Sequence, residues 1–288
     1  MGLLDGKAAL VTGSGRGIGR GIAIALAAAG AKVVVNDLGA TLDGEGEEKT
    51  PADQVVDEIL TKGGAAVTNY GSVSDWNQAH QMVDQVVETF GKIDILVNVA
   101  GILRDRMIFN MTEAEWDAVV AVHLKGTFNC MQAASVYMRQ QRSGRIISMS
   151  SVSALGAAGQ PNYAAAKMGI VGLTWSSARA LGKYGVTVNA ISPGAATRMT
   201  DSVPTDRRRT RPEVDEWSPD NVAPIVAYLA SERSGWITGR IIHSSGYEVS
   251  LYSNPEPVVR IVGTGPWQPD ALAEQVERSF GPLLGRAR

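Results

Sequence analysis

The sequence predicts an α/β fold of the doubly wound type, with a parallel sheet covered by helices on both faces. Between Lys7 and His243, short runs rich in β-branched residues alternate with segments of helical periodicity, the pattern of repeated βαβ units. Most of these runs are dominated by apolar residues, as expected for strands buried on both faces. A glycine-rich turn directly follows the first run, and an acidic residue ends the second. These features predict a ligand site at the carboxyl ends of the strands.

We expect seven parallel strands, joined by right-handed crossovers that place helices on both sides of the sheet. The runs that predict them are residues 8–12, 32–37, 65–70, 93–98, 145–150, 187–191 and 240–243. Two segments interrupt the alternation. Residues 39–49 are rich in glycine and acid and predict a surface loop. Residues 201–219, with an arginine run at 207–211, are long enough to suggest a functional lid.

The chain is expected to divide at residue 246. Residues 1–246 hold all of the predicted strands and would form the α/β domain. Residues 247–288 form a C-terminal extension with five prolines and a candidate amphipathic helix near residues 270–280. We expect this extension to pack on the domain or on a neighbouring subunit.

Composition excludes several classes of function. Lysine and arginine number 27, and aspartate and glutamate number 29, so the net charge of −2 offers no basic excess to a nucleic acid backbone. The single cysteine, Cys130, cannot form an internal disulfide, and no cysteine or histidine cluster with metal-ligand spacing accompanies the three histidines. We therefore expect no nucleic acid partner, no metal and a reducing compartment.

No membrane partner is expected either. The residues after Met1 lack the basic region and the long apolar region of a secretory signal. The longest uncharged stretch, residues 146–166, is interrupted by four serines and by Gln160, Pro161 and Asn162, so it does not predict a membrane-spanning helix. The expected location is cytoplasmic.

The glycine-rich turn is typical of a Rossmann-type dinucleotide site. Residues 12–19 (TGSGRGIG) follow the first predicted strand and open a helix rich in alanine and isoleucine. Glycines permit positive φ and close backbone approach, and the free N–H groups of the helix N-terminus receive the pyrophosphate. The residues expected to bind it are Gly13, Arg16, Gly17, Ile18 and Gly19. A tight strand-to-helix turn without a ligand is the alternative.

Asp37 is expected to choose between the two nicotinamide dinucleotides. It ends the second predicted strand, 18 residues beyond Gly19, where a carboxylate accepts hydrogen bonds from the adenosine ribose hydroxyls. The same carboxylate would repel a 2′-phosphate, whereas the guanidinium of Arg16 could pair with one. NAD is therefore favoured over NADP. The alternatives are a helix cap or solvated turn for Asp37 and a solvated loop charge for Arg16.

Tyr163 and Lys167 form a candidate proton-transfer pair. Their i, i+4 spacing in a predicted helix makes them neighbours on one face. A phenol with an ordinary pKa of about 10 is a poor base at neutral pH, but a nearby ammonium and a positively charged nicotinamide lower that pKa. Serines end the fifth predicted strand at the ligand-binding edge, where one of them could polarise a carbonyl. The alternative is an interfacial tyrosine, a solvated lysine and serines that cap a loop.

Five motifs taken together resemble the short-chain dehydrogenase/reductase family, over residues 4–246. They are residues 12–19, Asn98-Val99-Ala100-Gly101, Ser150-Ser151, residues 163–167 (YAAAK) and Pro193-Gly194. Five further segments are similar to the (3R)-hydroxyacyl-CoA dehydrogenase units of peroxisomal multifunctional enzymes of type 2. They are residues 33–39 (VVVNDLG), 101–106 (GILRDR), 116–126 (WDAVVAVHLKG), 159–167 (GQPNYAAAK) and 198–200 (RMT).

The resemblance implies a catalytic set of Ser151, Tyr163 and Lys167. Tyr163 would be the general acid/base, Lys167 would hold the nicotinamide ribose and lower the tyrosine pKa, and the serine would bind the substrate oxygen. The family usually places its serine thirteen residues before the tyrosine, which counts back to Ser150. Matching the strand and its serine pair points to Ser151 instead. We choose Ser151 and infer a one-residue deletion in the loop that follows.

The resemblance also implies cofactor-binding residues beyond the glycine turn and Asp37. They are Ser72, Val73, Asn98, Ala100, Gly101, Tyr163, Lys167, Pro193 and Gly194. Two positions depart from the family pattern, because Val99 replaces the second asparagine of NNAG and Ser72 replaces an aspartate beside the adenine. The family's helix asparagine, whose main-chain carbonyl supports a proton-relay water, falls at His123. We expect the His123 side chain to be structural.

The implied function is an NAD-dependent oxidoreductase that interconverts a 3-hydroxyacyl-CoA and a 3-oxoacyl-CoA. The alternatives are a hydroxysteroid dehydrogenase, a 3-oxoacyl carrier-protein reductase and, from another class, a non-catalytic dinucleotide-binding protein. The expected partner is thus a small acyl-CoA or steroid-like substrate. The arginine run could meet CoA phosphates or be a solvated loop of mixed charge. Family members are usually dimers or tetramers, so a homodimer or homotetramer is expected.

Overall fold

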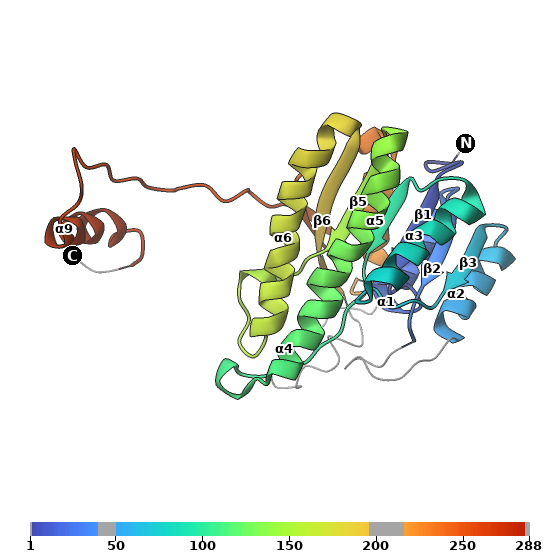
Figure 1. Cartoon of the computed structure of the whole chain (residues 1–288), viewed down its shortest axis with the longest axis horizontal. Coiled ribbons are helices and arrows are strands. Elements are labelled where there is room, and N and C mark those ends of the chain that lie inside the picture. The colour runs from blue at the N-terminus through green and yellow to red at the C-terminus, as the bar shows by residue number, and fades with distance from the viewer. Residues whose placement is uncertain (1, 40–49, 196–215, 286–288) are drawn as a thin grey trace. The chain divides into compact units, whose positions relative to one another are not determined.

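The computed structural model describes residues 2–39, 50–195 and 216–285. The chain forms two compact units, Met1–Tyr252 and Ser253–Arg288. The first holds the sheet and its covering helices, and the second contains α9 (Pro269–Phe280), which confirms the expected C-terminal helix (Figure 1). The first unit continues past the expected boundary at residue 246, because strand β8 pairs with β7 beyond it. The surface loop and most of the lid segment expected from the sequence lie outside the described residues.

The sheet confirms the doubly wound α/β class. Its order is β3-β2-β1-β4-β5-β6-β7-β8. The parallel strands are β1 (Ala8–Thr12), β2 (Lys32–Asn36), β3 (Ala65–Asn69), β4 (Ile95–Asn98), β5 (Gly144–Met149), β6 (Val186–Gly194) and β7 (Ile241–Ser245). The expected seven strands are correct as parallel strands, but the sheet has an eighth. Strand β8 (Glu248–Leu251) runs antiparallel to β7, and its residues are all exposed, so it lacks the apolar run that identified the others.

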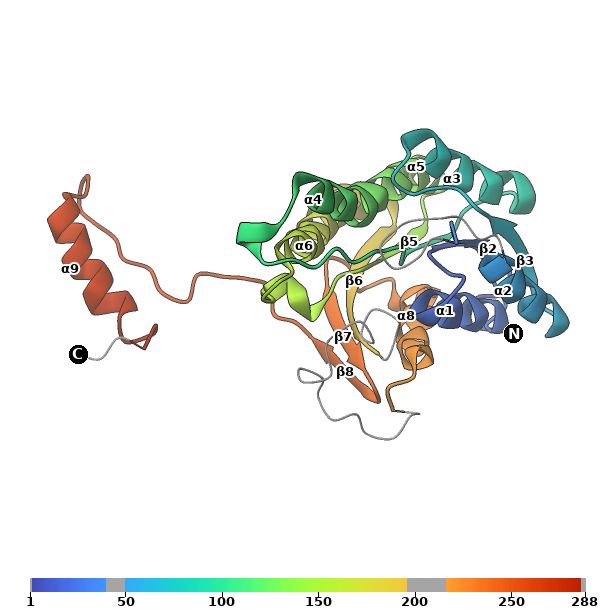
Figure 2. The same cartoon turned by 90° about the horizontal axis from the view of Figure 1, so that it is seen from below.

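Helices cover both faces of the sheet, as Figure 2 shows. On one face lie α1 (Gly17–Ala28), α2 (Thr50–Thr61) and α8 (Ala223–Leu229). On the other lie α3 (Trp76–Phe90), α5 (Gly126–Gln141) and α6 (Pro161–Leu181), with α4 (Glu113–Val120) leading into α5. A π-helical turn, Ala121–Lys125, joins α4 to α5.

The packing of strand β2 explains why its sequence has three consecutive valines. Val33 and Val35 pack in one core with helices α1 and α2, whereas Val34 between them packs in the other core with α3. Successive side chains of a strand point to opposite faces, and both faces are covered here. Because both faces are packed, the buried strands hold the residues at their carboxyl ends in fixed positions.

The order of the strands creates the ligand-binding crevice. Strand β1 lies between β2 and β4, so the chain leaves β1 towards one edge of the sheet and continues from β3 to its other side. At such a switch point the connections diverge, and a crevice opens outside the carboxyl ends of the strands. The glycine turn, Asp37 and the segment after β4 all lie at this edge.

The opposite end of the sheet is fastened by Asp94, which is 7% exposed. Its Oδ2 accepts the main-chain N–H of Ala8 at 2.8 Å, so it joins the start of β1 to β4. Lys92 Nζ lies 3.0 Å from Oδ2, and Lys7 Nζ lies 3.8 Å from Oδ1. A buried carboxylate with these partners satisfies a donor that the sheet itself leaves unpaired.

We predict that Asp94→Ala lowers the free energy of unfolding by about 2 kcal/mol, because it leaves the Ala8 N–H buried without an acceptor. Urea unfolding followed by circular dichroism measures the change. The exposed carboxylate variant Asp57→Ala, on α2, should change it by less than about 0.5 kcal/mol. Equal effects of the two variants would contradict this role for Asp94.

Candidate active site and cofactor cleft

The turn between β1 and α1 is packed too closely for a side chain at Gly13 or at Gly19. Gly13 has φ 62°, and a Cβ there would lie 2.6 Å from the Cα of Ala100. A Cβ on Gly19 would lie 2.1 Å from the carbonyl oxygen of Gly13. The side chain of the N-cap residue, Arg16, makes no capping hydrogen bond to the first turn of α1. That turn also has no acidic residue. Its N–H groups and dipole can thus receive an anionic group.

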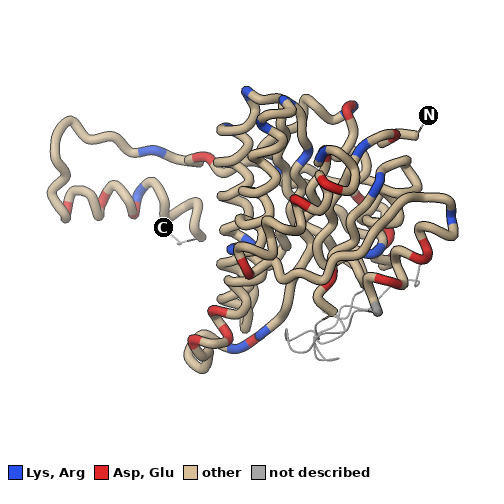
Figure 3. Tube along the Cα trace, turned by 45° about the vertical axis from the view of Figure 1, so that its right-hand side comes forward, with Lys and Arg blue, Asp and Glu red and all other residues tan. Residues whose placement is uncertain are grey.

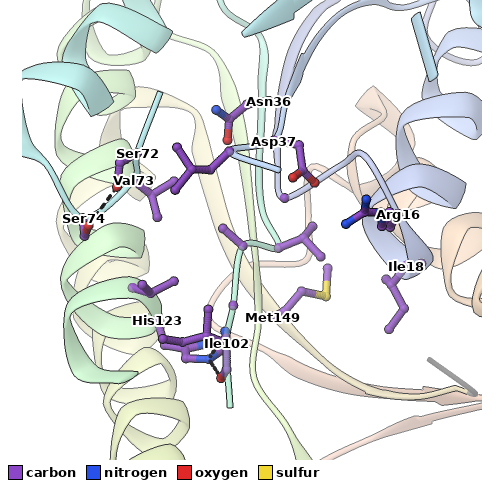
Figure 4. Close-up of a pocket in the computed structure, with 18 of the residues that line it drawn as sticks. Arg16, Ile18, Asn36, Asp37, Ser72, Val73, Ser74, Ile102, His123 and Met149 are labelled. Atoms are coloured by element: carbon purple, nitrogen blue, oxygen red, sulfur yellow. Dashed lines mark hydrogen bonds between the residues drawn. The ribbon is translucent and has the colours of Figure 1, made fainter. Parts of the chain in front are cut away.

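A cleft of about 560 Å³ opens beside this turn, and most of the expected cofactor residues line it (Figure 4). Those that line it are Gly13, Arg16, Gly17, Ile18, Gly19, Asp37, Ser72, Val73, Ala100, Gly101, Tyr163, Lys167 and Pro193. Its size falls in the range of small-molecule sites. In Figure 4, Arg16 and Asp37 lie on one side of the cleft, and Ser72 and Val73 lie on the other. Residues far apart in the sequence therefore meet around one space.

Asp37 is held at the cleft by the glycine turn itself. Its Oδ2 accepts the N–H of Gly15 at 2.8 Å, and its Oδ1 accepts the N–H of Gly39 at 2.8 Å. A Cβ on Gly15 would lie 2.8 Å from Asp37 Oδ2, so glycine permits this close approach. The carboxylate is thus fixed in place and carries its negative charge into the cleft.

Two expected cofactor residues do not line the cleft. Asn98 is 5% exposed and donates from Nδ2 to Ser148 Oγ at 3.2 Å, so it supports the sheet beneath the cleft. Gly194 follows the lining residue Pro193, and a Cβ there would lie 2.5 Å from Ser245 Oγ. Both residues end buried strands, β4 and β6. Membership of a family motif did not show whether a residue there lines the cleft or supports the strands beneath it. Their assignment as cofactor-binding residues stays a prediction.

The two candidate serines have different surroundings. Ser150 is 2% exposed, and its hydroxyl donates to the carbonyl oxygen of Lys167 at 3.1 Å. Ser151 is the N-cap of a short 3₁₀ helix, where its Oγ accepts the N–H of Ser153 at 3.1 Å. The Ser151 hydroxyl also acts on the Tyr163 phenol, whose pKa it lowers. Ser150 thus fastens α6 to the sheet, while Ser151 faces the tyrosine.

Tyr163 lies in the first turn of α6, with its ring against the cleft. Burial raises the pKa of its phenol above the ordinary value, the hydrogen bond with Ser151 lowers it, and the charge of Asp105 raises it again. The net direction is upward. The protonated phenol is therefore the form that the protein without a bound molecule favours at neutral pH.

Lys167 is buried, at 4% exposure, one helical turn from Tyr163. Its Nζ donates to the carbonyl oxygen of Met149 at 2.7 Å and lies 5.4 Å from the centre of the Tyr163 ring. Burial lowers the pKa of its ammonium to about 7. With this pKa the lysine is charged only in part at neutral pH. The expectation that this ammonium, together with a bound nicotinamide, lowers the tyrosine pKa stays a prediction.

His123 lies in the π-helical turn and is 1% exposed. Its Nε2 lies 2.8 Å from the carbonyl oxygen and 3.1 Å from the amide nitrogen of Ile102, so one tautomer or the other bonds this main chain. Its ring meets that of Tyr163 edge to face, with centres 5.0 Å apart. Burial first, and then the charge of Lys167, lower its pKa well below the ordinary value. The ring is thus neutral, and it holds the Tyr163 ring and the Ile102 main chain in place.

Sequence reasoning missed several residues that line the cleft. They are Asn36, Leu38, Gly71, Ser74, Val99, Ile102, Val122 and Met149. Ser150, one of the two candidate serines, lines it as well. Most follow or end a strand, so their position at the carboxyl edge of the sheet was the available signal. It did not show which of them point into the cleft.

Metal-ligand clusters and membrane-spanning helices are the next features to consider in the described residues. Within residues 2–39, 50–195 and 216–285, no group of three or more histidine, cysteine, aspartate or glutamate side chains could hold a metal ion. Among the helices of that same part of the chain, none combines the length and the apolar character that crossing a membrane requires. Basic and acidic residues are interspersed along the trace (Figure 3).

Comparison with known proteins identifies the class. A family profile described as "Enoyl-(Acyl carrier protein) reductase" matches residues 13–247. A crystal structure of a short chain dehydrogenase from Mycobacterium avium superposes with a TM-score of 0.85 and 44% identity, over 100% of this chain and 97% of that one. The chain belongs to the short-chain dehydrogenase/reductase family. It is an oxidoreductase acting on CH–OH groups, and the non-catalytic alternative is set aside.

Several curated relatives are similar over most of this chain. Peroxisomal multifunctional enzyme type 2 of Drosophila melanogaster is 48% identical over 86% of it, but the chain spans only 40% of that longer protein. A 3-oxoacyl-[acyl-carrier-protein] reductase of Staphylococcus aureus is 44% identical over 83% of the chain and 97% of its own length. Hydroxyacyl-CoA dehydrogenase ChsB1 of Mycobacterium tuberculosis is 41% identical over 96% of this chain and 89% of its own.

The cleft fits the nicotinamide dinucleotide that such dehydrogenases use. The turn after β1 has no room for a Cβ at Gly13 or Gly19, as close approach of a pyrophosphate requires. Asp37 offers acceptors at one end of the cleft, and Tyr163 and Lys167 lie at the other. These residues would hold the dinucleotide along the carboxyl edge of the sheet.

We predict that Gly101→Ala lowers the free energy of unfolding by about 2 kcal/mol, because its Cβ would lie 2.3 Å from His123 Cε1. The double variant Gly101→Ala/His123→Ala should recover part of this loss, since the clashing ring is removed. Thermal or urea unfolding of the two single variants and the double variant gives the coupling energy. Strict additivity would contradict the contact.

Proposed function

We propose that this protein is an NAD-dependent dehydrogenase that interconverts a 3-hydroxyacyl-CoA and a 3-oxoacyl-CoA. The observation that carries the acyl-CoA part is the extent of the match with the hydroxyacyl-CoA dehydrogenase of Mycobacterium tuberculosis, which covers 96% of this chain and so includes its C-terminal unit. The resemblance to the dehydrogenase units of multifunctional enzymes agrees with it. Oxidation and reduction at a CH–OH group are common to the whole family. The proposal adds to this the acyl-CoA substrate and the preference for NAD.

The preference for NAD rests on Asp37. Its carboxylate is fixed by two main-chain N–H groups and lines the cleft where the adenosine ribose would lie. A ribose with free hydroxyls can donate to it, whereas a 2′-phosphate would meet a like charge at close range. Arg16 lines the cleft too and could oppose this preference, but it does not remove the fixed negative charge.

Two side chains would act on the substrate itself. In oxidation, the Tyr163 phenolate takes the proton of the substrate hydroxyl, and a C=O bond forms as the carbon releases hydride. The Ser151 hydroxyl donates to the substrate oxygen and keeps it at the tyrosine. When bound, the nicotinamide supplies the hydride acceptor for oxidation and the hydride donor for reduction. In the reverse direction the Tyr163 phenol returns the proton to the carbonyl oxygen.

Lys167 and His123 support this exchange without touching the substrate oxygen. The Lys167 ammonium, charged in part at neutral pH, stabilises the phenolate when it forms. The neutral ring of His123 adds no competing charge, and it keeps the Tyr163 ring and the Ile102 main chain in place. The polar groups are thus arranged before substrate arrives, which is what proton transfer in a buried site requires.

Reduction of a carrier-protein-bound 3-oxoacyl group is the second candidate. It is favoured by the Staphylococcus aureus relative, which the match covers almost entirely. The two candidates share the reacting carbons and differ in the carrier of the acyl group. A hydroxysteroid substrate has no comparable observation in its favour.

We predict NAD-dependent oxidation of (3R)-hydroxyacyl-CoA esters, measured by absorbance of the reduced nicotinamide against a panel of CoA esters, carrier-protein thioesters and hydroxysteroids. Tyr163→Phe should lower kcat by about 10³-fold or more, while the Kd for NAD changes less than about twofold, because only the proton-transfer group is lost. Turnover limited to carrier-protein thioesters would favour the second candidate. Unchanged kcat in Tyr163→Phe would refute the assigned acid/base.

We predict that Asp37→Asn lowers the ratio of kcat/KM for NAD to that for NADP by about tenfold or more, because the variant keeps a hydrogen-bond acceptor but removes the negative charge. Steady-state kinetics with both cofactors give the ratio. Asp57→Asn, an exposed carboxylate on α2, provides the matched control. A ratio that is the same in both variants would argue against Asp37 as the selective residue.

A further inference from the structure

The helix that carries Tyr163 begins without an ordinary cap. Gln160 is the N-cap residue of α6, but its side chain makes no capping hydrogen bond, and Pro161 follows it at the first helical position. The N–H of Ala164 is bonded to the carbonyl oxygen of Gln160, so the N–H of Tyr163 precedes the first main-chain bond of the helix. This buried donor therefore needs an acceptor from a side chain.

Asn162 supplies that acceptor. Its Oδ1 accepts the N–H of Tyr163 at 2.8 Å. Asn162 is 0% exposed, and its Nδ2 donates to the carbonyl oxygens of Arg104 and Glu115 at 3.0 and 3.1 Å. Both N–H donors of the amide are thus used, and its oxygen faces an N–H, so the orientation of the amide is fixed. A buried amide with all these partners allows little movement.

Asn162 joins three segments, which are the loop after β4, helix α4 and the start of α6. A small apolar cluster unites the same three segments, and Tyr163 packs against it. Its buried members are Ile102, Val119 and Ala166, one from each segment. The amide and the cluster therefore hold the first turn of α6 from two sides.

Two further hydrogen bonds join the loop after β4 to the start of α6, but their loop residues are exposed. The N–H of Arg106 donates to the carbonyl oxygen of Gly159 at 2.8 Å. Asp105 Oδ2 accepts from Gln160 Nε2 at 2.7 Å. Arg106 and Asp105 are both exposed, so water competes with these bonds. The bonds of Asn162 are the buried ones of this junction.

The groups around the Tyr163 ring are held independently of Asn162. Lys167 Nζ is bonded to the carbonyl oxygen of Met149 at 2.7 Å and lies 5.4 Å from the ring centre. The ring of His123 meets the Tyr163 ring edge to face, and its Nε2 is bonded to the main chain of Ile102. A shift of the Tyr163 main chain would thus move the phenol relative to groups that stay in place.

We propose that Asn162 is a positioning residue for the reaction, whose amide fixes the main chain of Tyr163 against the loop after β4 and against α4. The phenol then meets the substrate oxygen in a constant geometry, which proton transfer and hydride transfer both require. Asn162 is not among the residues that line the cleft, so it acts through Tyr163 and not on the substrate. This inference rests on the proposed role of Tyr163 as the acid/base.

Steady-state kinetics of Asn162→Ala give the first measurement, with any substrate of the panel that the wild-type protein turns over. We expect kcat to fall by about 10²-fold, while the Kd for NAD changes less than about twofold, because the phenol is displaced and the lining of the cleft is kept. Asn162→Ser, which is too short to reach either carbonyl oxygen, provides a second variant and should behave in the same way.

Asn189→Ala provides the matched control. Asn189 is 1% exposed, its Nδ2 donates to the carbonyl oxygen of Ile237 at 2.9 Å, and its Oδ1 accepts the N–H of Arg240 at 3.1 Å. It lies on β6 and is not among the residues that line the cleft. Its loss removes a comparable buried amide, so kcat should change less than about threefold.

Combination with Tyr163→Phe separates positioning from a general loss of structure. In the Tyr163→Phe background, Asn162→Ala should lower the remaining kcat by less than about threefold, because the hydroxyl that it positions is already absent. A loss as large as in the wild-type background would show a merely structural role and overturn the inference. A loss of kcat in Asn189→Ala equal to that in Asn162→Ala would overturn it as well.

NMR of the protein with tyrosine labelled at ¹³Cζ gives a measurement that needs no substrate. The Tyr163 signal, assigned by its loss in Tyr163→Phe, should shift or broaden in Asn162→Ala and in Asn162→Ser, and stay in place in Asn189→Ala. A signal that does not change in either Asn162 variant overturns the inference. Absence of turnover in the wild-type protein would count against the proposed function, while the NMR signal would still decide whether Asn162 positions Tyr163.

Discussion

The close contact between the turn after β1 and the segment after β4 is the constraint on which the rest of the site depends. Thr12 Oγ1 accepts the N–H groups of Val99 and Ala100, at 3.1 and 3.3 Å, and fastens the two strand ends together. Gly13 lets the two main chains touch. This contact fixes the floor of the cleft, and from it Gly101 and Ile102 continue to His123. The pyrophosphate side and the acid/base side are therefore parts of one rigid unit.

The acid/base side combines burial with a small number of charges. Burial alone works against an active tyrosine, because it raises the phenol pKa, and against a charged lysine, because it lowers the ammonium pKa. The protein without a bound molecule therefore keeps Tyr163 protonated and leaves Lys167, with a pKa of about 7, close to the balance between its charged and neutral forms. The positive charge of a bound nicotinamide would favour the Tyr163 phenolate, the form that accepts a proton in oxidation.

Much of the site could be predicted because its motifs follow strands. The glycine turn, Asp37 and the pair Tyr163 and Lys167 were found from local spacing, and all of them line the cleft. Asn98 and Gly194 belong to the same family motifs but support the cleft from below or beside it, because side-chain direction at a strand end depends on local packing. Strand β8 was missed because it alternates polar and apolar residues, from Glu248 to Leu251, instead of forming a continuous apolar run. All four residues are exposed, and the strand is defined by its pairing with β7.

The sequence by itself determined the class of fold, the parallel strands and the glycine turn, and it indicated Tyr163 and Lys167 as a candidate pair, since these follow from periodicity and short-range spacing. Only the tertiary structure decided which serine faces Tyr163, how far burial moves the tyrosine and lysine pKa values, and that Asp105 lies beside a helix that begins more than fifty residues later. These depend on which groups are brought together and on how much water is excluded around them. Neither quantity is encoded in a local pattern, because both arise from packing between distant segments.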